Sequence, residues 1–97
     1  MHARVTFATA QPGKTDEAIK VMRDSILPAA KKQKGFKRLL FLTDRNTGKG
    51  MSIVLWNTEA DMTAAESSGF YREQVAKEAP LMAGAPTMEH YEVSVQG

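Results

Sequence analysis

Two neighbouring segments of the sequence, residues 36–44 and 51–57, are apolar at both odd and even positions. Successive side chains of a β-strand point to opposite faces, so strands of this kind need apolar cover on both sides. The residues between the segments, RNTGKG, carry two glycines able to take the positive φ of a turn. The sequence therefore predicts a β-hairpin that is covered on both of its faces.

The segments on either side of the hairpin have the periods of two more strands and a helix. Residues 3–10 and 87–95 alternate between apolar and polar side chains, which is the pattern of a half-buried strand. In the stretch that opens at Thr15, apolar residues recur every three or four positions, as in an amphipathic helix. Pro28 is expected to kink this helix, or to end it and begin a new turn.

A second helical stretch is predicted to open at Thr58, a suitable N-cap, and to be interrupted at Gly69. The order of elements is then β-α-β-β-α-β, and we expect a single domain over residues 1–97. Short connections and right-handed crossovers turn this order into a four-stranded antiparallel sheet with both helices on one face, the ferredoxin-like arrangement of the α+β class. A second copy of the sheet is the simplest cover for the other face of the hairpin, so we expect a homodimer.

Composition excludes several classes of protein. The 97 residues contain no cysteine, which rules out disulfides, thiolate metal sites and cysteine nucleophiles, and a reducing cytoplasm is the expected location. No apolar run approaches the roughly 18 residues of a membrane span, and the first residues lack a signal-peptide core. The net charge is +2, and the basic cluster from Lys31 to Arg38 is more typical of a solvated helix end than of an anion-binding patch.

Metal ions and nucleic acids are not expected partners. The two histidines are far apart in the sequence, and the remaining carboxylates are typical of a solvated helix surface. RNA-recognition motifs share the β-α-β-β-α-β order, but the positions where they stack bases on aromatic rings are Met51 and Ile53 here. Without aromatic side chains at these positions, the sheet offers no platform for bases.

Three passages carry a resemblance to a known family: the PGK turn, the segment ILPAAKKQKGF and the segment VLWNTEADM. With the order of elements, they resemble the antibiotic biosynthesis monooxygenase family of dimeric α+β barrels over essentially the whole chain. The resemblance implies a homodimer with a small-molecule pocket between sheet and helices in each protomer. Some members oxidise polyphenolic substrates with dioxygen and no cofactor, others degrade haem, and many have no established activity.

The resemblance thus implies a small-molecule-binding protein, with a cofactor-independent monooxygenase of aromatic or polyphenolic substrates as one form of that function. The alternative is a non-catalytic ligand-binding or structural dimer. The haem-degrading branch carries an Asn, a second Trp and a His at positions that fall near Ala8, Ala65 and Val75. Because Ala and Val neither ligate iron nor donate hydrogen bonds, haem degradation and a haem cofactor are not expected.

A cofactor-free oxygenase needs a base for an acidic phenol, donors for the oxyanion and an apolar cavity that admits dioxygen. His90, in the middle of a strand, is the candidate base, and the competing interpretation is an exposed histidine paired with Glu89 or Glu92. Tyr91 shares its parity with Val93 and Val95 and is expected in the core. If these three residues pack under the helices, His90 points to the opposite face, into the dimer barrel.

The candidate pocket residues come from several elements. Trp56, the only tryptophan, either plugs the end of the core or walls the pocket, and the plug is favoured. Tyr71 is a candidate donor to a substrate oxygen, and Arg38 either holds an anion or is solvated. The candidate pocket or substrate-binding residues are therefore Trp56, Tyr71, Arg38, Phe7 and Met62.

Overall fold

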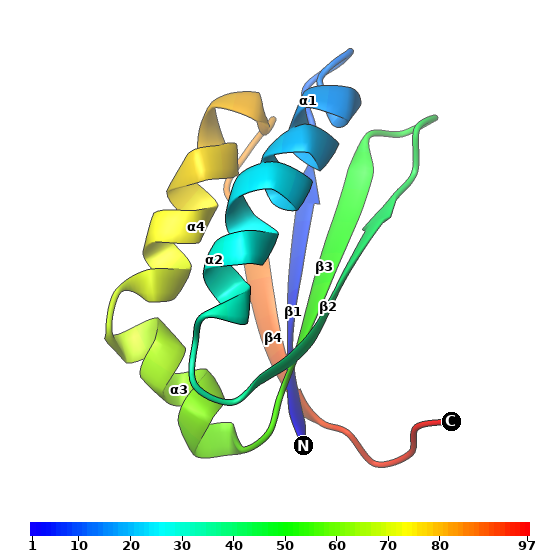
Figure 1. Cartoon of the computed structure of the whole chain (residues 1–97). Helices are drawn as coiled ribbons and strands as arrows, with labels where there is room; N and C mark the ends of the chain where they lie inside the picture. The colour runs from blue at the N-terminus through cyan, green and yellow to red at the C-terminus, as the bar shows by residue number, and fades with distance from the viewer.

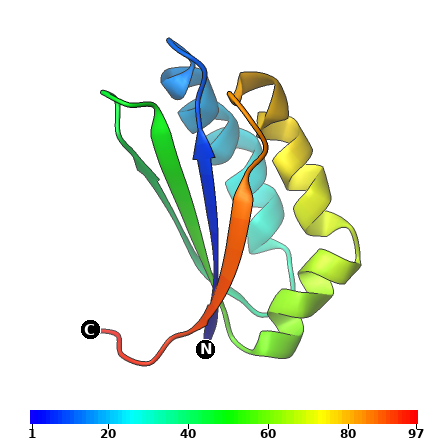
Figure 2. The same ribbon diagram turned by 180° about the vertical axis from the view of Figure 1, so that it is seen from behind.

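The computed structural model describes all 97 residues and confirms an α+β, ferredoxin-like fold. The helices cover one face of a four-stranded antiparallel sheet and leave the other face bare (Figure 1, Figure 2). Both crossover connections carry the helices to the same side of the sheet, as the order of elements predicts. The strands, which lie in the order β2-β3-β1-β4, are β1 (His2–Thr9), β2 (Phe36–Thr43), β3 (Lys49–Trp56) and β4 (Thr87–Glu92).

The helical layer consists of two interrupted helices. The first runs from Thr15 to Lys31 with a π-helical segment in its middle, and the second is broken at Gly69. No helix is long and apolar enough to span a bilayer. The segments are α1 (Thr15–Val21), the π-helical η1 (Met22–Ile26), α2 (Leu27–Lys31), α3 (Glu59–Ser67), α4 (Phe70–Glu78) and the 3₁₀-helical η2 (Ala79–Leu81).

Pro28 accounts for the interruption of the first helix. Proline has no N–H, and its ring clashes with the carbonyl one turn earlier, so the regular bonding pattern fails at this point. The chain widens into η1 immediately before Pro28, which itself lies in the first turn of α2. The segment continues in the same direction and buries Met22 and Ile26. The second of the two predicted effects is therefore the one observed, a new α-helical segment with the proline in its first turn, and a π-helical segment that was not predicted joins it to α1.

The second helix begins and breaks where the sequence predicts. The Thr58 hydroxyl accepts a hydrogen bond from the backbone N–H of Asp61 at 3.0 Å, which caps α3. Gly69 has φ of 89°, a left-handed conformation that an L-residue rarely adopts, and it separates α3 from α4. This break gives α4 its own direction across the sheet.

The strand register determines which side chains lie beneath the helices. Arg4 of β1 pairs with Val54 of β3 and with His90 of β4, and these three residues share the covered face. Their neighbours Val5 and Ile53 share the bare face. The set of β1 side chains that includes Arg4 therefore faces the helices, and the apolar set that includes Val5 faces outward.

The expected placement of Tyr91, Val93 and Val95 under the helices is wrong. Strand β4 ends at Glu92, Val95 is 91% exposed, and Tyr91 is 51% exposed on the bare face. The hydroxyl of Tyr91 donates to Glu89 at 2.6 Å, since residues two apart share a strand face. The alternation of β4 is present, but the side chains at the positions of Tyr91 and Glu89 lie on the uncovered side of this edge strand.

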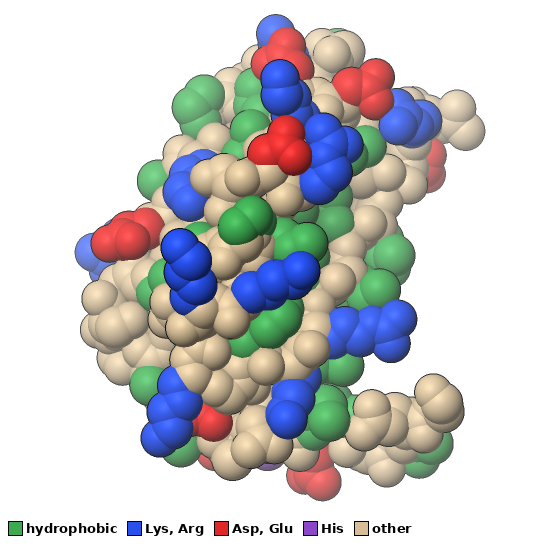
Figure 3. All heavy atoms as spheres, viewed as in Figure 1, with side chains coloured by type: hydrophobic (Ala, Val, Ile, Leu, Met, Phe, Trp, Pro, Cys, Tyr) green, Lys and Arg blue, Asp and Glu red, His purple; other side chains and the backbone are tan.

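Lysine and arginine side chains are scattered over the surface in Figure 3, and several stand beside acidic side chains. The basic cluster begins in the last turn of α2, where Lys31 is exposed and complements the helix dipole. Gly35 follows with φ of 82°, and a Cβ atom there would collide with the side chain of Asp61. The turn after α2 is therefore held closely against α3.

Candidate functional site

A cavity of about 490 Å³ lies between the sheet and the helices, in the size range of small-molecule sites. It exists because β1 and β3 direct small side chains toward the helices along much of their length. These side chains leave space that the alanines and β-branched residues of the helical layer do not fill. The small residues of this hollow are Thr6, Ala8, Ala10, Gly48, Gly50 and Ser52.

One end of the cavity is closed by a packed cluster around Trp56. Trp56 is fully buried and packs with Val54, Met62 and Ala65, and its ring meets Phe36 edge-on at 6.3 Å between centroids. Trp56 also lines the cavity, so it is a core plug with one side toward the hollow. Met62 is buried in the cluster and does not line the cavity, which corrects its assignment as a pocket residue.

A buried arginine stands beside this closed end. Arg4 is only 3% exposed, and its guanidinium carbon lies 4.4 Å from the ring centroid of Tyr71 and 5.3 Å from that of Trp56. Its Nη1 donates to Glu66 at 3.1 Å. Burial lowers the pKa of Arg4 from its ordinary value, and the bond to Glu66 opposes that change. The cavity thus has a paired cation at one end.

His90 lies outside the cavity and on the covered face. The condition for its pointing into a dimer barrel, Tyr91 packed under the helices, is not met. Its Nε2 is 2.8 Å from Oε2 of Glu66, the same oxygen that accepts from Arg4. The side chain is 44% exposed. The competing interpretation of a paired histidine is closer to the structure, although the partner is Glu66 from α3 and not a neighbour on the strand. A helix packed across the sheet supplies this partner, which strand periodicity does not reveal.

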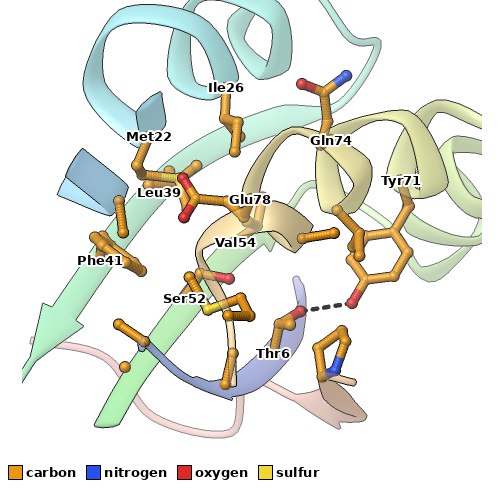
Figure 4. A pocket seen from close by; sticks show the side chains of 18 of the residues that line it. Thr6, Met22, Ile26, Leu39, Phe41, Ser52, Val54, Tyr71, Gln74 and Glu78 are labelled. Carbon is orange, nitrogen blue, oxygen red and sulfur yellow. Dashed lines mark hydrogen bonds between the residues drawn. The ribbon is translucent and has the colours of Figure 1, made fainter. Parts of the chain in front are cut away.

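The other predicted pocket residues divide between the two faces of the sheet. Tyr71 lines the cavity, and its hydroxyl lies 2.9 Å from the Thr6 hydroxyl (Figure 4). Phe7 and Arg38 do not line it, because the register of β1 and β2 turns them to the bare face. Their assignment to the pocket is therefore corrected.

Glu78 is the cavity residue that the sequence analysis missed. Glu78 is 9% exposed, and neither of its carboxylate oxygens has a hydrogen-bond partner. Burial raises the pKa of Glu78 to about 7. In Figure 4 the side chain extends from the end of α4 toward Met22 and Leu39. The cavity therefore contains an acid that titrates near neutrality.

A sequence signal for Glu78 did exist. Tyr71, Gln74 and Glu78 are spaced at three and seven residues, so they share one face of α4. Gln74 is also buried, and its side-chain oxygen accepts from Lys77 at 2.8 Å. Polar side chains on one face of a helix are normally solvated. Here this face of α4 is turned toward the sheet and the cavity, so its side chains are buried.

The site offers no arrangement suited to a metal ion. Nowhere do three or more His, Asp or Glu side chains gather in a way that could hold one. Ala8 and Val75, two of the positions considered for haem chemistry, line the cavity with methyl groups, and Ala65 packs in the core cluster. The cavity supplies apolar contact, and its polar groups include the guanidinium of Arg4, the hydroxyl groups of Thr6, Ser52 and Tyr71, and the carboxyl group of Glu78.

No family model matches the sequence. The uncharacterised protein Rv2557 of Mycobacterium tuberculosis is 30% identical over an alignment of 98 positions, which covers 97% of this chain and 41% of that protein. Its uncharacterised counterpart Rv2558 is 28% identical over 96 residues, 98% of this chain and 39% of the relative. The chain thus spans about two fifths of the length of these relatives.

Solved structures match the chain over nearly its full length. A proposed antibiotic biosynthesis monooxygenase of Nitrosomonas europaea has a TM-score of 0.78 and 17% identity, and the match covers 98% of this chain and all of that one. SnoaB of Streptomyces nogalater, a cofactor-independent oxygenase, has a TM-score of 0.73 and 13% identity over 98% of this chain and 94% of its own. The chain therefore has the fold of the antibiotic biosynthesis monooxygenases.

Proposed function

We propose that the protein binds a small aromatic molecule in the cavity and is a cofactor-independent monooxygenase of a phenolic or polyphenolic substrate. The observation that carries the proposal is the cavity itself, which is mostly apolar and has a few polar groups pointing into it. The fold shared with SnoaB, which is a cofactor-independent oxygenase, supports the same chemistry.

The chemistry requires a base and hydrogen-bond donors from the site. A base removes a proton from the substrate, and the resulting electron-rich anion reduces dioxygen directly. One oxygen atom stays on the ring carbon, and the other leaves as water with the two hydrogens that the substrate loses. Donors must then stabilise the developing negative charge, and the candidates are the N–H groups of Arg4 other than the one bonded to Glu66, and the Tyr71 hydroxyl if it exchanges its Thr6 partner for the substrate.

The same proposal includes a homodimer formed through the bare face of the sheet. Leu42 is 48% exposed there, beside half-buried or exposed apolar residues of three other strands. A monomer rarely leaves an apolar surface of this kind in water. A second sheet would cover it and close the barrel. The residues concerned are Phe7, Leu40, Leu42, Met51, Ile53, Leu55 and Tyr91.

Ligand binding is tested first, with a panel of phenolic, polyphenolic and non-aromatic compounds. A compound that binds only the folded state raises the melting temperature, by an amount that follows its concentration and Kd. Trp56 is the only tryptophan and lines the cavity, so a concurrent change in its fluorescence locates the binding. We expect aromatic compounds to raise the melting temperature and to change the fluorescence of Trp56, and non-aromatic compounds to do neither.

Catalysis is tested separately, by oxygen uptake with each bound phenol in the absence of any added cofactor. Uptake with formation of an oxidised product supports the monooxygenase. Binding without uptake would leave the alternative function, a non-catalytic ligand-binding dimer. If no aromatic compound shifts the melting temperature or the fluorescence of Trp56, the proposed function is wrong.

A further inference from the structure

The carboxyl group of Glu78 is the one buried acid of the cavity that has no partner in the chain. Both of its oxygens are closed off from bulk water and accept no hydrogen bond. Glu66, the other acid near the cavity, already accepts from Arg4 and His90. Burying an acceptor without a donor is unfavourable, so the position favours any molecule that brings a donor to it.

The surroundings of Glu78 leave this role to a ligand. The helical elements opposite α4 contribute only uncharged side chains to the cavity, namely Thr15, Ala18, Met22, Ile26 and Ala30. The other titratable side chains that line the cavity are Arg4 and Tyr71, and both have partners already. No charge of the protein therefore competes for the carboxyl group of Glu78.

We propose that Glu78 recognises the hydroxyl group of a phenolic ligand and accepts its proton. The phenolic O–H bond breaks, a carboxyl O–H bond forms on Glu78, and the phenolate keeps the electron pair. This inference rests on the proposed function, because it names the group that would ionise the substrate of that reaction.

A neutral hydroxyl suits this position better than an ammonium group. A phenol has one donor, which the carboxylate satisfies, whereas an ammonium group has three. Figure 4 shows Met22 and Leu39 beside Glu78, and the side chains of these two neighbours offer no acceptor for the other two N–H groups of an ammonium ion. A cationic ligand would therefore lose hydrogen bonds to water without replacement.

Three probes of one ring system separate these interactions: naphthalene, 1-naphthol and 1-naphthylmethylamine. Their affinities are measured calorimetrically at about pH 8, where Glu78 is mostly ionised. For the unaltered protein we expect 1-naphthol to bind about tenfold more tightly than naphthalene, because a hydrogen bond to a charged acceptor is among the stronger ones. We expect the amine to bind least, because two of its three N–H donors would lose their hydrogen bonds to water.

Two variants test the residue and one serves as control. Glu78→Gln keeps a hydrogen-bond acceptor but cannot take a proton, and should reduce the preference for 1-naphthol several-fold. Glu78→Leu removes the acceptor and should abolish the preference while naphthalene still binds. The matched control is Glu73→Gln, the same substitution at an exposed position of α4, which should change nothing.

The outcomes distinguish the inference from the proposed function. If naphthalene and 1-naphthol bind equally and the Glu78 variants change neither affinity, the cavity is an aromatic site but Glu78 is not its recognition group. Tighter binding of the amine than of 1-naphthol would also overturn the inference. If neither naphthalene nor 1-naphthol binds, the proposed function itself fails, and the inference with it.

Discussion

The two faces of the sheet differ in a way that runs against ordinary expectation. Beside the Trp56 cluster, the middle of the covered face carries small or polar side chains such as Thr6, Ala8 and Gly50, and it encloses a cavity. The bare face carries Leu40 and Leu42, which are 37% and 48% exposed. In a simple two-layer protein the large apolar side chains would lie under the helices.

This difference indicates that the two faces of the sheet have different roles. The helices do not complete the core over the middle of the sheet, because the small residues leave room there for a ligand. The large apolar residues lie where they can pack against another molecule. Packing within the chain is then concentrated at the closed end of the cavity, around Trp56 and Met62.

The largest expected effect comes from the bare face. Leu42→Glu places an unpaired charge in the proposed dimer interface and should weaken association at least about a hundredfold. Sedimentation equilibrium should give twice the 10.7 kDa chain mass for the unaltered protein and a single chain for the variant. Lys37→Glu, at an exposed position of β2, is the control and should remain dimeric. A monomeric unaltered protein would contradict the dimer.

A matched pair of alanine substitutions compares the packed and hollow regions of the covered face. Ala65→Leu, in the packed cluster, should lower the free energy of unfolding by about 1–3 kcal/mol through overpacking. Ala8→Leu, in the cavity, should change it by less than about 1 kcal/mol and should prevent binding of 1-naphthol. Urea unfolding and calorimetry measure the two effects. Equal destabilisation by both would mean that the cavity is not a real void.

The pH dependence of stability tests the buried acid. The ordinary pKa of a glutamate is 4.5 and that of Glu78 in the folded chain is about 7. Between these values the unfolded chain releases the proton first, so the free energy of unfolding falls as the pH rises. Glu78→Gln lacks this loss and should be more stable than the unaltered protein by on the order of 1–2 kcal/mol at about pH 8.

At about pH 4 the carboxyl group of Glu78 is protonated in both states, and the difference from Glu78→Gln should be small. Glu73→Gln again provides the control, since this exposed residue should show no such pH profile. Parallel profiles for the unaltered protein and Glu78→Gln would show that the carboxyl group is solvated.

The smallest effect is expected for His90. Its pair with Glu66 is 44% exposed on the histidine side, so His90→Ala should change the free energy of unfolding by less than about 1 kcal/mol. Binding of 1-naphthol should persist, because the imidazole does not line the cavity. His2→Ala, which removes the other histidine and its pair with Glu59, is the control. A loss of oxygen uptake of about a hundredfold in His90→Ala alone would restore His90 as the base.

Local sequence determined the elements and their order. The interruption at Pro28, the cap at Thr58 and the break at Gly69 depend on a few neighbouring residues, and all three occur where they were expected. The double apolar character of the hairpin also revealed that both faces of the sheet need cover. These features follow from backbone sterics and from the period of the side chains, which are local properties.

The tertiary structure alone decided which face of each strand lies under the helices. Alternation separates the side chains of a strand into two sets, but it does not say which set faces inward when both sets contain apolar residues. Phe7 and Tyr91 were expected on the covered side and lie on the bare one, and the position of His90, which was conditional on that of Tyr91, is the covered side. Glu78 entered the site for a related reason: an acid on a polar helix stripe becomes buried only when another layer lies across it, and that contact joins residues far apart in the sequence.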